Sequence, residues 1–166
     1  VKFFPEGGAL LTVAHQNIAF KAQGSDGFST EIEGFLFDAN GDTLTAFRSE
    51  HDGMGVFTLN PTVGNSYYVI AKSGDGISKR FDLPAVEEKG ITLSMTHYKK
   101  EIRYEIQKTE ATEWPQKLFL IAHTRGKLVI LQPVSIDRTF GRMNDSLFNA
   151  GITHFMLIDQ QGNALS

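Results

Sequence analysis

One short turn carries side chains that could bind a metal ion. Asp38-Ala39-Asn40-Gly41-Asp42 places three oxygen-bearing side chains at alternate positions, as the start of a calcium loop does. An EF-hand loop also needs glycine at its sixth position and glutamate at its twelfth. This chain has Thr43 and Ser49 there. Asp, Asn and Gly are also the residues that a tight hairpin turn requires, so the pattern favours a turn over a calcium site.

Histidines are the next candidates, as metal ligands or as acid–base groups. No two of them have the i, i+2 strand spacing or the i, i+4 helix spacing that most readily aims two imidazoles at one ion. The chain has no cysteine, which excludes disulfides, thiol nucleophiles and thiolate metal sites. The sequence therefore predicts no metal and no cofactor. The five histidines are His15, His51, His97, His123 and His154, of which His51 is interpreted as turn scaffolding beside Asp52.

No serine has the surroundings of a catalytic nucleophile. The chain contains no Gly-x-Ser-x-Gly turn, which is the usual setting of an activated serine between a strand and a helix. The glycine-rich segments 24–27 and 74–76 lack the strand-to-helix context of a phosphate-binding loop. We therefore expect the chain not to be an enzyme.

The alternative function is a carbohydrate-binding or accessory module of a polysaccharide-utilisation protein, which would depend on exposed aromatic residues. Such a module needs two or three coplanar exposed rings on one face. Tyr67 and Tyr68 are adjacent in an expected strand and point to opposite faces, so they cannot form one platform. Trp114 is interpreted as cover for a core edge or domain junction. The possible contributors are Tyr67, Tyr68, Tyr98, Tyr104 and Trp114.

The elements that position these residues are strands that recur about every ten residues. Helical periodicity is confined to 144–151, where Asn144 can cap one turn and Gly151 can end it. Residues 124–126 predict a hairpin turn with Gly126 at positive φ. The expected strands are 10–13, 17–22, 31–38, 43–50, 56–59, 66–72, 78–83, 91–98, 101–108, 117–123, 127–133 and 152–159, with another starting at 163–166.

One motif occurs twice. The strand and turn that contain Asp38 and Gly41 resemble those that contain Asp159 and Gly162, since each has an apolar strand, Asp, two residues and then Gly. Two hairpins of similar length that converge on the same turn would explain this similarity. Descent of both halves from one sandwich module would explain it equally well.

Composition limits the class of protein. At 166 residues with 41% hydrophobic content and 13 phenylalanines, the chain can form one large β domain or two small ones. The net charge of −3 comes from mixed charges, which argues against a nucleic-acid surface. No apolar run is long enough to span a membrane.

The charged segment after Pro84 predicts a boundary between domains 1–86 and 87–166. The last strand of the second domain is expected to be cut short.

Several ordered motifs carry a family resemblance. They include Phe3-Phe4-Pro5-Glu6-Gly7-Gly8-Ala9-Leu10, Glu50-His51-Asp52-Gly53-Met54-Gly55-Val56-Phe57 and Ala122-His123-Thr124-Arg125-Gly126. Together they resemble the macroglobulin-like region of large bacterial envelope proteins, some of which also carry a TonB-dependent receptor plug domain. Residues 34–68 separately resemble carboxypeptidase regulatory-like sandwich domains, with their order of strand, Asp-x-x-Gly, strand, Gly-x-Phe and Tyr.

The resemblance implies a fold and a role. The expected fold is all-β, with two tandem antiparallel β-sandwich domains of immunoglobulin-like or macroglobulin-like type. The expected role is a non-catalytic structural or protein-interaction module excised from a larger protein. Its partners would be neighbouring domains of the same parent or another envelope protein, not nucleic acid. The expected location is the periplasm, outer membrane or cell surface of a Gram-negative bacterium, with this segment outside the bilayer.

Overall fold

A computed structural model describes residues 1–166, and strands form almost all of its regular structure. The predicted all-β sandwich class is confirmed. The chain divides into two compact units, Val1–Glu88 and Lys89–Ser166. Whether each unit is a domain that folds on its own stays a prediction. The one helix is a 3₁₀ turn, Asp145–Leu147, which the Asn144 side chain caps by accepting a hydrogen bond from the Ser146 N–H, so helix occurs only where it was expected.

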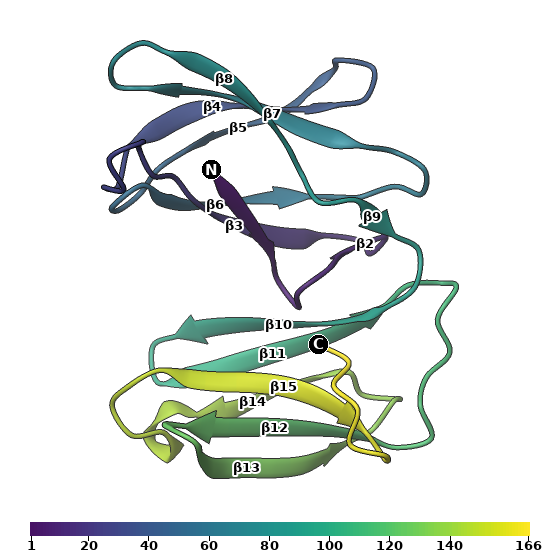
Figure 1. Cartoon of the computed structure of the whole chain (residues 1–166). Coiled ribbons are helices and arrows are strands. Elements are labelled where there is room, and N and C mark those ends of the chain that lie inside the picture. The colour runs from purple at the N-terminus through teal and green to yellow at the C-terminus, as the bar shows by residue number, and fades with distance from the viewer. The chain divides into compact units, whose positions relative to one another are not determined.

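The first unit, Val1–Glu88, contains two antiparallel sheets (Figure 1). One sheet has four strands in the order β5-β4-β7-β8, and the other has three in the order β1-β3-β6. A short parallel pair, β2-β9, is a third sheet. The strands are β1 (Lys2–Pro5), β2 (Leu10–Leu11), β3 (Gln16–Lys21), β4 (Ile32–Asp38), β5 (Thr43–Arg48), β6 (Met54–Leu59), β7 (Tyr67–Ser73), β8 (Ser78–Asp82) and β9 (Val86–Glu87).

Alternation along the strands builds the core of the first unit. In β7, Tyr67, Val69 and Ala71 are buried, and the residues between them face outward, as the two-residue period of a strand requires. Aromatic side chains from both sheets meet inside, where the rings of Phe20 and Phe47 lie 5.2 Å apart at an interplanar angle of 73°. The inner face of the four-stranded sheet thus packs in the core, and its outer face does not take part in this core.

The second unit, Lys89–Ser166, has two three-stranded antiparallel sheets, β10-β11-β14 and β13-β12-β15. Both contribute to one core, which includes Leu93 and Ile106 from the first sheet and Leu120 and Leu157 from the second. The strands are β10 (Ile91–Tyr98), β11 (Glu101–Lys108), β12 (Leu118–Thr124), β13 (Lys127–Val134), β14 (Phe140–Asn144) and β15 (Thr153–Asp159).

The strand expected to start at 163–166 is not a regular strand. Ala164 forms an isolated bridge with Ile158, and the Leu165 N–H donates to the Leu157 carbonyl at 2.9 Å. Three strands were also missed: β1, β9 and β14. The hairpin β12–β13 turns at Arg125 and Gly126, both at positive φ (52° and 77°), so the prediction for Gly126 is confirmed.

Candidate functional site

The Asp38 turn uses its carboxylate to hold the backbone. Asp38 Oδ1 accepts hydrogen bonds from the N–H groups of Asn40 and Asp42, both at 2.9 Å. Gly41, at φ 88°, donates its N–H to the Asp38 carbonyl. The Asp38 carboxylate thus stabilises the turn itself, as Asp does in tight hairpin turns. The structure contains no group of three or more His, Cys, Asp or Glu side chains that could hold a metal ion.

The Asp159 turn repeats this geometry. Asp159 Oδ1 accepts from the N–H groups of Gln161 and Asn163 at 2.9 and 2.8 Å, and Gly162 has φ 85°. The side-chain amide of Asn163 donates to Oδ2 at 2.8 Å. That bond, followed by backbone N–H groups of the turn, holds the pKa of the Asp159 carboxyl below its ordinary value. The two copies of the motif therefore form the same hydrogen-bonded turn, which fits either explanation of their similarity.

Two histidines pair with a neighbouring aspartate at the surface. His51 Nε2 lies 3.0 Å from Asp52 Oδ2, and His97 Nε2 lies 3.1 Å from Asp145 Oδ2. The glycine-rich segments 24–27 and 74–76 form turns, in which Asp26 and Asp75 accept backbone N–H groups. The Ser73 hydroxyl donates to the Asp75 carboxylate and lowers its pKa. Asp26 and Asp75 line one hollow of the first unit together with Lys79, and each carboxylate is engaged by its own turn.

The five aromatic candidates do not form a platform. Tyr67 is buried, as alternation predicted, and its hydroxyl accepts the Thr62 N–H at 3.0 Å. Tyr104 is buried over Gly141, and Trp114 packs against the core of the second unit. Tyr98 is exposed without an aromatic neighbour, and Arg103 lies 5.4 Å from its ring centre.

A different aromatic face was missed, on the outer surface of the four-stranded sheet. Phe35 of β4 has Ala46 of β5 and Ile70 of β7 as its register partners. Phe35 is 52% exposed and Ile70 is 40% exposed, so neither contributes to the core. Val56 of β6, 49% exposed, lines the same hollow. We call Phe35, Ala46, Val56 and Ile70 the apolar row.

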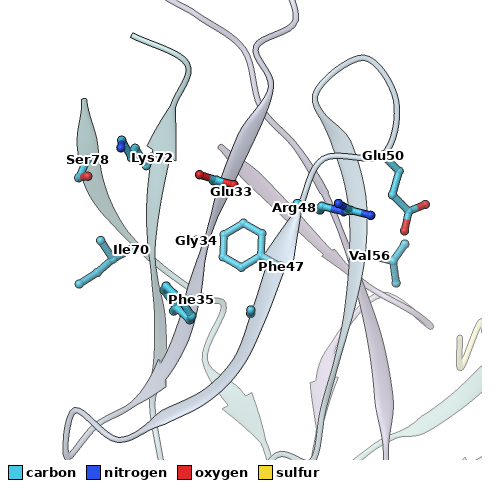
Figure 2. Close-up of a pocket in the computed structure, with 11 residues that line it drawn as sticks. Glu33, Gly34, Phe35, Phe47, Arg48, Glu50, Val56, Ile70, Lys72 and Ser78 are labelled. Atoms are coloured by element: carbon cyan, nitrogen blue, oxygen red, sulfur yellow. The ribbon is translucent and has the colours of Figure 1, made fainter. Parts of the chain in front are cut away.

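The apolar row lines a shallow groove of about 680 Å³ (Figure 2). Charged side chains lie beside it. Glu33 has Arg48 and Lys72 as register partners on its two sides, and Figure 2 shows Glu33 between them. Glu50 lines the groove next to Val56. The groove therefore combines an apolar centre with a border of both charge signs.

Beyond the apolar row, a second set of side chains crosses the same face. Phe37 and Tyr68, register partners, stack with ring centres 5.2 Å apart at an interplanar angle of 13°. The Arg80 guanidinium lies 3.6 Å from the centre of the Tyr68 ring. Because β4 and β8 flank β7 on opposite sides, Phe37 and Arg80 cover the two faces of that ring. Tyr68 is thus unable to stack on a sugar.

A sequence signal for this face existed in β4. Phe35 and Phe37 alternate with Gly34 and Leu36, so the strand is apolar on both faces. A strand with one solvated face normally alternates apolar and polar residues. Apolar residues on the outward face of β4 therefore indicate a second apolar surface. The register partners on β5 and β7 extend this surface.

No helix of the structure has both the length and the apolar character needed to cross a membrane. No protein-family model matches this chain, and a search of curated proteins found no match either.

Proposed function

We propose that this chain is a non-catalytic protein-interaction module, and that the groove over the apolar row is the surface that binds its protein partner. The observation that carries the proposal is the exposure of Phe35 and Ile70 side by side, next to charged side chains of both signs. Protein interfaces commonly have an apolar, aromatic centre and a polar rim. A contiguous apolar surface on a soluble fold marks an interaction site more often than scattered apolar residues do.

The chemistry of the face favours binding over catalysis. Asp75 and Asp159 have a lowered pKa because hydrogen bonds stabilise the carboxylate, and both lie in exposed turns. Neither lines the groove. Charges of both signs beside an apolar centre suit a protein partner, because each charge can find its complement and fix the register of docking.

The resemblance to macroglobulin-like regions extends this proposal. It supports a module within a larger cell-envelope protein of a Gram-negative bacterium, at the periplasm, outer membrane or cell surface. The partner would then be a neighbouring domain of the same parent or another envelope protein. The carbohydrate alternative has less support, because Phe37 and Arg80 cover the ring of Tyr68.

Photo-crosslinking tests the proposal. A photoreactive phenylalanine analogue replaces Phe35 in the full chain, and the chain is irradiated in an extract of the organism that makes it. The matched control places the same analogue at Phe28, which is 74% exposed and lies outside the groove. We expect one defined protein adduct from position 35 and none from position 28. Adducts of the same kind from both positions, or none from either, would overturn the proposal. Specific binding on a glycan array would favour the carbohydrate alternative instead.

A further inference from the structure

Two histidines that are far apart in sequence meet in the second unit. His123 of β12 and His154 of β15 are direct register partners. Their rings stack with centres 5.0 Å apart at an interplanar angle of 14°. Unlike His51 and His97, neither has an acidic partner. Spacing along the chain could not reveal this pair, because strand register creates it.

One ring nitrogen of the pair has no hydrogen-bond partner. His123 Nδ1 is buried and has no hydrogen-bond partner within the chain, a condition that in native proteins calls for a specific explanation, such as a bound water or ion. A β-bulge falls at Ala122 and His123 in the pairing with β13. Bulges re-aim side chains and are over-represented next to functional sites. The sequence position of His123 therefore coincides with a local change in strand geometry.

A hollow of about 390 Å³ opens beside the two rings and is lined by His123, Arg125, Gly126, Gly151, Ile152 and His154. Gly126 and Gly151 form part of its wall. Stacked rings hold their nitrogen lone pairs parallel, so rotation about the side-chain bonds is needed before both can point at one atom. No carboxylate lines the hollow.

We propose that His123 and His154 together bind one divalent transition-metal cation of the Zn²⁺, Ni²⁺ or Cu²⁺ class. Neutral imidazole is the commonest protein ligand for these ions. Opposed residues of an antiparallel pair have Cβ atoms about 4.5–5.5 Å apart, close enough for both rings to reach one ion. Two protein ligands leave the remaining coordination positions to solvent, so the ion is exchangeable.

Arg125 supplies an internal check on the proposal. It is exposed, makes no ion pair and is the one permanently charged residue on the hollow. Its charge opposes a bound cation, so removing it should strengthen binding. Arg125→Asn is suited to this test, because Asn tolerates the positive φ of 52° and Asn-Gly is a preferred two-residue hairpin turn.

The experiment is a Zn²⁺ titration of the full chain. Calorimetry measures the affinity, and the amide chemical shifts of Thr124 and Thr153 report where the ion binds. His154→Gln changes an exposed side chain and should weaken binding by about tenfold or more, because one of two ligands is lost. His123→Gln should do the same. Arg125→Asn should tighten binding about threefold through the removed repulsion. His97→Gln, in the exposed His97–Asp145 pair, is the matched control and should change nothing.

The proposal is overturned if wild type shows no Zn²⁺ binding, if His154→Gln binds as tightly as wild type, or if His97→Gln weakens binding as much as His154→Gln does. Chemical-shift changes that cluster at Asp145 instead of Thr124 and Thr153 would also overturn it.

Discussion

The two units differ in how much apolar material they bury. The core cluster of Val1–Glu88 has thirteen buried residues, and that of Lys89–Ser166 has eight. The first core also contains a set of three mutually contacting rings, Phe20, Phe47 and Phe57. Burial of apolar area is the main stabilising contribution to folding. The first unit should therefore be the more stable, and it can leave Phe35 and Ile70 exposed without losing its fold.

The largest effect should come from Gly34 of β4, which has no room for a side chain. A Cβ at this position would overlap the carbonyl oxygen of Ile70 and come within 2.9 Å of the Ala71 Cα. Gly34→Val should cost at least about 4 kcal/mol and remove the thermal transition of the first unit. Gly74→Ala is the control, because nothing lies within 4 Å of its Cβ position, and it should melt like wild type. Equal melting of both variants would mean that β4 and β7 separate easily.

The comparison between the units is tested by one matched pair of substitutions. Leu36 and Leu120 are both fully buried, one in each core. Leu→Ala at each should cost about 2–5 kcal/mol. Because the second core is smaller, Leu120→Ala should unfold its unit at ambient temperature while Leu36→Ala still shows a folded transition. If each substitution lowers one shared transition equally, the chain unfolds as a single cooperative body.

A smaller effect should follow from the hairpin turn of the second unit. Gly126 has φ 77° and no atom near its Cβ position, so a side chain there meets backbone strain and no clash. Gly126→Val should destabilise the unit by about 1 kcal/mol or more. A lowered melting temperature for the second unit alone, measured by circular dichroism, is the expected result. An unchanged value would show that the turn readily adopts another conformation.

The smallest effect on stability should come from Asp159 and should appear only at low pH. Hydrogen bonds lower the pKa of Asp159 in the folded chain, so the charged carboxylate stabilises the fold. This contribution is complete above the ordinary pKa of about 3.9 and is lost as pH falls through the lower folded value. Asp159→Asn should therefore flatten the fall in melting temperature of the second unit below about pH 4. A wild-type curve that matches the variant would contradict the role of this turn.

Most of the strands could be predicted because alternation and turn residues are local properties. Both β10 and β11 have the predicted bounds. Strand β14 was missed because Phe140-Gly141-Arg142-Met143-Asn144 has no β-branched residue. It pairs with β11, where the Tyr104 ring covers Gly141. That contact depends on the tertiary fold.

The candidate sites were harder to predict, for a related reason. The outward phenylalanines Phe35 and Phe37 are visible in the sequence, but the groove also needs Ala46 and Ile70 from neighbouring strands. The pairing of His123 with His154 depends on the register of β12 against β15. Register between strands distant in sequence follows from packing of the whole unit, which local patterns do not encode.

The most direct test of the proposed binding face is the affinity of the full chain for the protein that the crosslink at position 35 identifies. Phe35→Ser should weaken that affinity by about tenfold or more, as for a central interface aromatic, and leave the melting temperature of the first unit unchanged. Phe28→Ser, the equally apolar control outside the groove, should change neither quantity. Equal affinity of wild type and Phe35→Ser would contradict the account.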